Sequence, residues 1–279
     1  MKPTHPLHKY MRPSAIRTAN CPGCGNGILT QAILRAIDEE GLDMDDFVFV
    51  SGIGCAAWIP SPLFLADTLH TTHGRPIAFA TGVKLAKPDR RVMVISGDGD
   101  LLAIGGNHFI HAARRNIDMT VVCVNNGIYG MTGGQVAPTT PIGLRTMTSP
   151  YGNIENDFDI SGLATAAGAT YVARWTVIQT RQITKSVRKA LEHRGFSFIE
   201  VVSHCPVQFG RKTGMGSSTQ MLDWLKEISV TATKASGMTP AELEGKIVVG
   251  EFVDIDKPVL DVELERMRRD AQGGDDAEN

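Results

Sequence analysis

Apolar residues along this chain fall into short unbroken runs, separated by longer stretches with helical spacing. Short runs rich in Val, Ile and Phe are typical of strands that are buried on both faces. The sequence predicts such strands at residues 47–50, 92–95, 120–124, 171–175 and 196–202. Apolar positions share one helical face over residues 25–41, and helices are also predicted over 101–115 and 185–194. This alternation predicts an α/β fold, an open and mainly parallel sheet flanked by helices.

The pattern weakens after residue 206. Residues 212–219 are rich in Gly, Ser and Thr, and a helix is predicted around residues 221–234. We therefore expect one main domain over residues 1–210 and a C-terminal extension over residues 211–279. Residues 273–279 are rich in glycine and acidic residues and are expected to be disordered.

Composition excludes several classes of protein. The chain of 279 residues is 42% hydrophobic and has a formal net charge of -2, as in an ordinary soluble globular protein. Its basic residues are scattered, so no stripe of charge indicates nucleic-acid binding. No apolar run approaches the roughly 20 residues of a membrane span, and the first 13 residues do not resemble a signal peptide. A cytoplasmic protein is expected, in which cysteines are metal ligands or buried thiols more often than disulfides.

Two polar motifs directly follow neighbouring predicted strands. Asp98 lies between two glycines after one strand, and Asn126 follows the next. A strand–helix–strand unit brings these two strand ends to the same edge of the sheet. A carboxylate, an amide oxygen and a backbone carbonyl such as that of Ile128 suit Mg²⁺, and backbone N–H groups of Gly99 and Asp100 would hold a diphosphate. Either motif alone is usually a turn, but together they predict a magnesium-diphosphate site.

Four of the five cysteines lie in predicted loops. Cys21 and Cys24 form a C-x-x-C pair before the first helix. Cys55 follows a glycine turn and Cys205 follows the last strand, whereas Cys123 lies inside an apolar strand, where a small buried side chain is the usual role. A single C-x-x-C fits a zinc site, a redox dithiol or an iron–sulfur cluster. A second cysteine pair, usual in a four-cysteine zinc site, is missing, and four loop cysteines match the number that a [4Fe–4S] cluster requires.

The residues around Asn126 also resemble a known family. GDG followed by NN is the thiamine-diphosphate motif, and the run NNGIYGMTGGQ at residues 125–135 resembles the β subunit of 2-oxoacid:ferredoxin oxidoreductases. The layout, a compact β chain with a separate α subunit, looks most like the 2-oxoglutarate type. The resemblance spans residues 21–205 and implies the thiamine-diphosphate-binding (PP-type) fold. It assigns Mg²⁺ to Asp98, Asn126 and the carbonyl of Ile128, and a [4Fe–4S] cluster to Cys21, Cys24, Cys55 and Cys205. The cofactor contacts that it implies are Ile53, Gly54, Cys55, Ala56, His73, Gly99, Asp100, Gly130 and Met131.

This resemblance implies an oxidoreductase that works only with a second subunit. The expected reaction is the coenzyme A-dependent oxidative decarboxylation of a 2-oxoacid, with 2-oxoglutarate the best match, or the reverse reductive carboxylation. Electrons would pass through the cluster to ferredoxin. The carboxylate that activates thiamine diphosphate is expected on an α subunit, in an αβ unit or an (αβ)₂ assembly, so no catalytic residue is assigned in this chain.

Other functions stay open at this point. Pyruvate and branched-chain 2-oxoacids are possible substrates, because Gly133 stands where some family members carry a lysine that could face the substrate carboxylate. A thiamine-dependent decarboxylase or synthase subunit without redox chemistry would keep Asp98 and Asn126 but would not need the loop cysteines. A metal-binding or sensor protein would keep the cysteines but would not need the diphosphate motif. Each of these last two alternatives explains half of the pattern.

Overall fold

A computed structural model describes residues 5–16, 18–215 and 217–272, and within them a single eight-stranded sheet organises the chain. The strands lie in the order β2-β1-β3-β4-β6-β5-β8-β7. Their bounds are β1 Phe47–Ser51, β2 Asp67–His70, β3 Arg91–Gly97, β4 Met119–Asn125, β5 Tyr171–Thr176, β6 Phe196–Val202, β7 Ser229–Thr231 and β8 Ile247–Asp254. Neighbouring strands are parallel except β5 and β8, which are antiparallel. The predicted open, mainly parallel sheet is confirmed.

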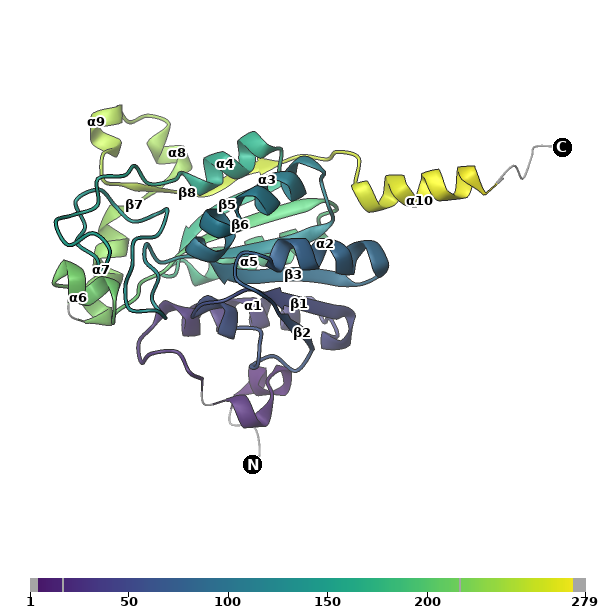
Figure 1. The fold of residues 1–279 in the computed structure, drawn as a ribbon, viewed down its shortest axis with the longest axis horizontal. Helices are drawn as coiled ribbons and strands as arrows, with labels where there is room; N and C mark the ends of the chain where they lie inside the picture. The colour runs from purple at the N-terminus through teal and green to yellow at the C-terminus, as the bar shows by residue number, and fades with distance from the viewer. Residues whose placement is uncertain (1–4, 17, 216, 273–279) are drawn as a thin grey trace.

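Helices cover both faces of this sheet (Figure 1). Because successive side chains of a strand point to opposite faces, β3 contributes Met93 and Ile95 to one core and Val92 and Val94 to the other. The first core is covered by α1 and α5, and the second by α2, α3 and α4. The helices are α1 Gly25–Glu39, α2 Pro76–Ala86, α3 Gly106–Arg114, α4 Ile160–Ala167, α5 Thr180–Glu192, α6 Phe209–Thr213, α7 Ser218–Ile228, α8 Ala232–Ala235, α9 Pro240–Leu243 and α10 Leu260–Ala271.

The helix predicted over residues 101–115 is wrong as one continuous helix. A π-helical turn, Gly99–Ile104, comes first, and α3 begins only at Gly106. The two meet at Gly105, where a methyl group would lie 2.5 Å from the carbonyl oxygen of Asp100. The backbone thus packs too closely there for any residue with a side chain, and the widened turn re-aims the chain directly after Asp98.

The chain after residue 210 continues the sheet before leaving it. The helix predicted around residues 221–234 ends at Ile228, where β7 follows, and β8 then pairs with β5. Helix α10 projects away from the rest of the molecule (Figure 1). The division of the chain at residue 210 stays a prediction, and residues 273–279 lie outside the described residues. Among the helices described, none has the length and apolar character needed to cross a membrane.

Candidate functional site

A cavity of about 300 Å³ lies where β1, β3 and β4 end. The sequence motifs predict a cofactor site at this edge, because parallel strands all end on the same side of the sheet. Every residue predicted to contact the cofactor or Mg²⁺ lines this one cavity: Ile53, Gly54, Cys55, Ala56, His73, Asp98, Gly99, Asp100, Asn126, Ile128, Gly130 and Met131. The fold therefore brings the predicted residues together from four separate segments, and their individual roles stay predictions.

Asp98 is a buried carboxyl group at the floor of the cavity, directly after β3. Its Oδ2 accepts hydrogen bonds from the hydroxyl of Thr139 and, at 3.1 Å, from the backbone N–H of Gly127. Burial raises the pKa of Asp98 to about 6, although these hydrogen bonds act in the opposite direction. No protein cation is among the groups that shift this pKa, so desolvation of the carboxylate outweighs the hydrogen bonds. A buried carboxylate in this situation fits a bound cation.

The loop after β4 adds two further oxygen donors beside Asp98. Asn126 and Ile128 both line the cavity, and the amide oxygen of Asn126 accepts the N–H of Ile128 at 3.2 Å. Gly127 between them has a φ of +68°, which favours glycine, and its carbonyl accepts the hydroxyl of Thr140 at 2.7 Å. A carboxylate, an amide and a carbonyl form the hard-oxygen donor set that Mg²⁺ prefers.

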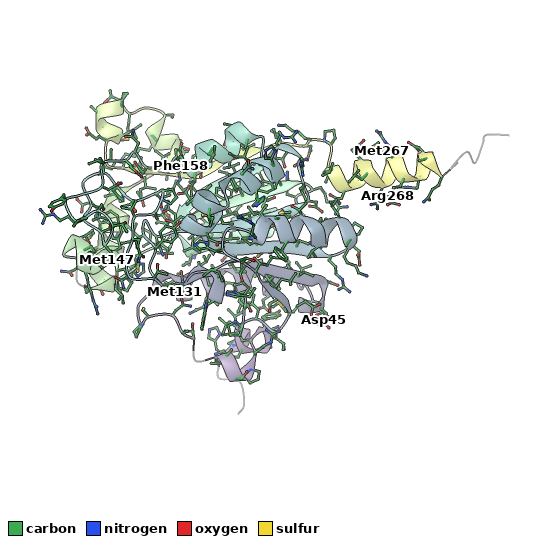
Figure 2. The ribbon with its side chains drawn as sticks, in the orientation of Figure 1. Asp45, Met131, Met147, Phe158, Met267 and Arg268 are labelled. Atoms are coloured by element: carbon green, nitrogen blue, oxygen red, sulfur yellow. The ribbon has the colours of Figure 1, made fainter. Side chains whose placement is uncertain are left out.

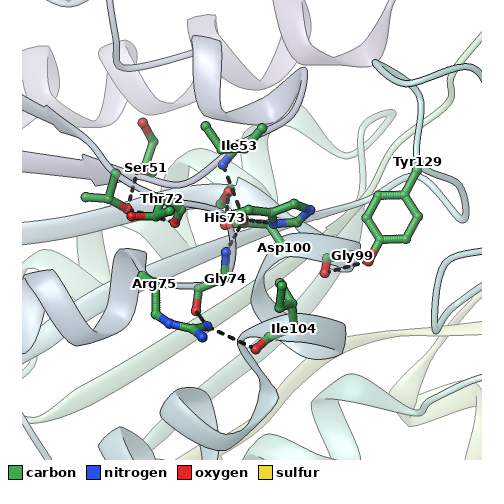
Figure 3. A network of polar contacts seen from close by, with 12 residues as sticks. Ser51, Ile53, Thr72, His73, Gly74, Arg75, Gly99, Asp100, Ile104 and Tyr129 are labelled. Carbon is green, nitrogen blue, oxygen red and sulfur yellow. Dashed lines mark hydrogen bonds and ion pairs between the residues drawn. The ribbon is translucent and has the colours of Figure 1, made fainter.

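The side chain of Asp100 connects three segments around the cavity (Figure 3). Its Oδ1 lies 2.5 Å from Nδ1 of His73, and it accepts the backbone N–H of Gly74 at 2.7 Å and of Ile53 at 3.2 Å. Its Oδ2 accepts the hydroxyl of Ser96 at 2.7 Å. The sequence indicated only a role for the backbone of Asp100. Its side chain has a different one, because it fixes His73 and the turn that precedes Cys55.

Glycines allow these close approaches. A methyl group on Gly52 would lie 2.0 Å from Oδ2 of Asp100, and one on Gly99 would lie 2.4 Å from the ring of Tyr129. The hydroxyl of Tyr129 donates to the carbonyl of Gly99 at 3.0 Å, and its ring lies edge-on to His73 at a centroid distance of 6.0 Å. The cavity wall therefore has little room to rearrange.

Two loop cysteines lie next to Gly130 in the cavity wall, and one of them, Cys55, also lines the cavity. A methyl group on Gly130 would lie 3.6 Å from Sγ of Cys205 and 3.7 Å from Sγ of Cys55. The pKa of Cys24 is raised to about 11, mainly by burial and in smaller part by the charges of Cys205, Cys55 and Cys21, which places the four thiols in one neighbourhood. Cys21 is exposed to solvent, whereas the other three are partly covered. The structure thus brings the four predicted ligands together beside the cofactor cavity.

Two further cysteine observations bear on the predicted roles. Cys123 is fully buried inside β4, as its apolar surroundings in the sequence indicate. Among residues 5–16, 18–215 and 217–272, no three His, Cys, Asp or Glu side chains lie close enough to share a single metal ion. Thiolates around a four-iron cluster are farther apart than those around one ion, since the cluster itself lies between them.

Two residues of the site were not predicted from the sequence. Thr139 bonds to Asp98 from a position 41 residues away, and Glu200 accepts the amide of Asn125 at 2.8 Å from 75 residues away. No local motif marks either residue. Only the fold, which places β6 beside β4, connects Glu200 to the loop of Asn126.

Comparisons with known proteins agree with this geometry. Residues 52–201 match the family described as thiamine pyrophosphate enzyme, C-terminal TPP binding domain. The chain is 55% identical over 263 residues to the 2-oxoglutarate synthase subunit KorB of Methanocaldococcus jannaschii, covering 94% of this chain and 97% of that protein. It is 46% identical over 187 residues to the 2-oxoacid:ferredoxin oxidoreductase subunit beta of Saccharolobus solfataricus, covering 67% of this chain and 61% of that protein.

A solved structure is similar over nearly the whole chain. It is the 2-oxoglutarate:ferredoxin oxidoreductase from Magnetococcus marinus with 2-oxoglutarate, coenzyme A and succinyl-CoA bound. The similarity has a TM-score of 0.85 at 32% sequence identity and covers 99% of this chain and 94% of that chain. Sequence and structure comparisons therefore indicate the same family.

Proposed function

The chain belongs to the thiamine-pyrophosphate-binding β subunits of the 2-oxoacid:ferredoxin oxidoreductase family, and we propose that with an α subunit it oxidises 2-oxoglutarate. In this reaction 2-oxoglutarate, coenzyme A and two oxidised ferredoxins give succinyl-CoA, CO₂, one proton and two reduced ferredoxins. The reverse reaction, reductive carboxylation, uses the same site. The proposal includes the expectation of a cytoplasmic enzyme. One observation carries it: Gly130 lines the predicted cofactor cavity, and a methyl group on it would lie within 3.6 Å of Sγ of Cys205 and 3.7 Å of Sγ of Cys55.

The residues of the cavity fit thiamine diphosphate and Mg²⁺. Asp98, Asn126 and the carbonyl of Ile128 would hold the metal, and the N–H groups of Gly99 and Asp100 would bind the diphosphate. When bound, thiamine diphosphate supplies the carbon nucleophile for the 2-oxo group and accepts the charge left when CO₂ departs. The protein orients the cofactor and excludes water, and the largely apolar cavity wall suits that task.

The four loop cysteines fit a [4Fe–4S] cluster. Such a cluster needs four thiolates, which would come from Cys21, Cys24, Cys55 and Cys205. Among the described residues, no three of the His, Cys, Asp and Glu side chains lie close enough to hold a single metal ion. A cluster would supply one-electron redox chemistry next to the cofactor, which suits a one-electron acceptor such as ferredoxin. This feature favours the redox reading over a thiamine-dependent decarboxylase, in which these cysteines would have no role.

A partner subunit is supported by the carboxylates of the cavity. Thiamine enzymes require a carboxylate beside the aminopyrimidine ring, yet the lining contains only Asp98 and Asp100. Asp98 is bound to Thr139 and Gly127 and would hold Mg²⁺, and Asp100 accepts hydrogen bonds on both oxygens. Among the residues that line the cavity, no carboxylate is then left for this task, and we assign it to the α subunit of an αβ unit or an (αβ)₂ assembly.

The choice of 2-oxoglutarate rests on the relatives. The Methanocaldococcus jannaschii protein is named for 2-oxoglutarate, and the Magnetococcus marinus enzyme was solved with that substrate. Gly133 has a φ of +114°, a conformation that disfavours a lysine there. Substrate selection by a lysine at this position is therefore not available to this chain.

The proposed function is tested on the αβ enzyme purified without oxygen. We expect four irons and four sulfides per β chain, an electron paramagnetic resonance signal on reduction, and viologen reduction that depends on coenzyme A and is faster with 2-oxoglutarate than with pyruvate. The β chain alone should show no activity, because it lacks the activating carboxylate. Stoichiometric zinc without sulfide would refute the cluster, and faster reduction with pyruvate would refute the substrate assignment.

A further inference from the structure

Four segments that together contain the cysteines and the cofactor loop have no acidic residues. The cysteines and the cofactor loop lie within residues 1–37, 47–66, 119–154 and 201–222. All 30 Asp and Glu residues of the chain lie outside these four segments. The distribution of charge is therefore strongly uneven, although the net charge is only -2.

Five of the exposed cations that the structure describes lie in these segments. Lys9 is paired with Asp38 and Arg35 lies on α1, whereas Arg145, Arg211 and Lys212 lie in the loop after β4 and on α6 and form no ion pair with a described carboxylate. The ammonium of Lys212 instead lies 3.8 Å from the sulfur of Met147, two residues after Arg145. Elsewhere in the chain, cations such as Lys84 and Lys189 are paired with carboxylates. Arg145, Arg211 and Lys212 define a surface that we call the basic edge.

The basic edge borders the cysteine group. Helix α6, which carries Arg211 and Lys212, is attached directly to the loop of Cys205, because the N–H of Gly210 donates to the carbonyl of Cys205 at 2.9 Å. The chain then runs to Ser218, whose hydroxyl would lie 2.2 Å from a methyl group on Gly23. Helix α6 thus lies in the short segment that connects Cys205 to the Cys21–Cys24 loop. Met147 lies beside this part of the molecule in Figure 2.

The cysteine group reaches solvent at Cys21. Cys21 is the exposed member of the cysteine group, whereas Cys24, Cys55 and Cys205 are partly covered. A carrier that docks there would approach the group at Cys21, which is not among the residues that line the cofactor cavity. Opposite charge on such a carrier speeds its encounter with the enzyme and orients it, without requiring a tight complex.

We propose that the basic edge, formed by Arg145, Arg211 and Lys212, is the docking surface for a small acidic one-electron carrier protein. This inference rests on the proposed function, because a carrier has a reason to dock only if the cysteines hold a redox cluster. It commits to the carrier as the occupant, since exposed cations that form no ion pair with a described carboxylate complement an acidic face. An interface with the α subunit is the competing occupant, which the test below identifies.

The test compares charge reversals in the αβ enzyme. Arg211→Glu combined with Lys212→Glu should lower kcat/KM for a purified acidic ferredoxin roughly tenfold or more at low ionic strength, and the deficit should shrink as salt is added. Methyl viologen reduction by 2-oxoglutarate should be unchanged, because that small acceptor needs no protein docking surface. The matched control, Lys87→Glu with Arg115→Glu, makes the same charge change on exposed residues near the opposite ends of the strands and should leave both activities unchanged.

Each outcome of this test either supports or contradicts the docking surface. An unchanged kcat/KM for ferredoxin, or a loss equal to that of the control, overturns the docking surface. Purification of the β variant without its α subunit also overturns it and assigns the edge to the subunit interface. Absence of viologen reduction in the unaltered αβ enzyme refutes the proposed function itself, and the docking surface with it. A salt-dependent loss confined to ferredoxin supports the proposal.

Discussion

Asp100 holds His73 at the wall of the cavity, with 2.5 Å between Oδ1 of the carboxylate and Nδ1 of the imidazole. The same carboxylate accepts the backbone N–H groups of Gly74 and Ile53, which belong to two different loops. One buried side chain therefore sets the position of both loops. Because the Ile53 loop leads directly into Cys55, Asp100 also couples the cofactor cavity to the cysteine group.

Replacing this carboxylate should loosen the site. Asp100→Asn keeps the size of the side chain but presents an amide N–H₂ group to backbone donors, so some buried donors lose their acceptor. We expect a loss of about 1–3 kcal/mol in the free energy of unfolding and a weaker affinity for thiamine diphosphate. Urea unfolding and quenching of tryptophan fluorescence on cofactor addition measure the two effects.

The control for this change is Asp89→Asn, which alters an exposed carboxylate. It should change neither quantity measurably. Gly52→Ala provides an independent check, because its methyl group would collide with the same carboxylate of Asp100. Normal cofactor affinity in both Asp100→Asn and Gly52→Ala would show that the loops keep their positions without this contact.

Asp98 should destabilise the metal-free protein at neutral pH. Its pKa is about 6 in the folded chain against 3.8 for an ordinary Asp, so the folded state holds a proton that the unfolded state releases. Stability is therefore unaffected below about pH 3.8, falls as the pH rises toward 6, and stays reduced above it. The size of this penalty is on the order of 3 kcal/mol.

Asp98→Asn removes the charge and so removes the penalty. Without metal, the variant should be more stable than the unaltered chain at pH 8, and the difference should vanish near pH 4. Added Mg²⁺ and thiamine diphosphate should stabilise the unaltered chain but not the variant, because the variant lacks the carboxylate ligand. Unfolding midpoints in urea at several pH values measure both effects. A difference in stability of the same size at pH 4 and pH 8 would rule out this explanation.

The cysteines should separate into two groups by their effect on iron content. Alanine at Cys21, Cys24, Cys55 or Cys205 should remove iron and sulfide from the chain, because a cluster is expected to lose a ligand. Cys123→Ala is the matched control, since Cys123 is fully buried in β4. It should retain iron and sulfide and lose only about 1–2 kcal/mol of stability through lost packing. Iron loss in Cys123→Ala alone would reverse the assignment.

The central strands could be predicted from sequence because burial on both faces leaves an unbroken apolar run. Residues 196–202 were predicted as a strand, and β6 has those bounds. The edge strand β2 was missed because its residues Asp67–His70 are mostly exposed and polar, so no hydrophobic pattern marks it. Strand β8 was missed for a different reason: its apolar residues are interrupted by Gly250 and Glu251, and it lies in the part of the chain where the alternation of strands and helices weakens.

Residues of the site differ in the same way, because some have a local sequence signal and others depend on contacts between distant parts of the chain. Asp98 and Asn126 directly follow apolar strands, so sequence order alone places them at one edge of the sheet. The side-chain role of Asp100 depends on loops that come before it in the chain, and that of Glu200 on strand pairing, so neither has a local signal. A contact between residues far apart in the sequence depends on the tertiary structure, and the local sequence pattern does not identify its two partners.

Glu200 provides the strongest test of these long-range contacts, because its carboxylate supports the loop of Asn126. Its carboxylate accepts Nε of Arg174 at 2.6 Å, the hydroxyl of Ser161 at 2.7 Å and the amide of Asn125 at 2.8 Å. Arg174 also pairs with Asp159, whose side chain is 68% exposed. Removing Glu200, the buried partner of Arg174, should therefore lower the free energy of unfolding much more than removing Asp159, the exposed partner.

Glu200→Ala leaves Arg174 with a buried charge that only the exposed Asp159 can balance. We expect a loss of about 3–5 kcal/mol in the free energy of unfolding, against less than about 1 kcal/mol for the control Asp159→Asn. Glu200→Gln should fold but bind thiamine diphosphate more weakly, because Asn125 also accepts the N–H of Gly127 at 3.3 Å, and Gly127 contacts Asp98. Urea unfolding and cofactor titration distinguish the two effects. If Glu200→Ala and Asp159→Asn were equally stable, the buried carboxylate would not be what holds this loop, and the weaker binding of Glu200→Gln would need another cause.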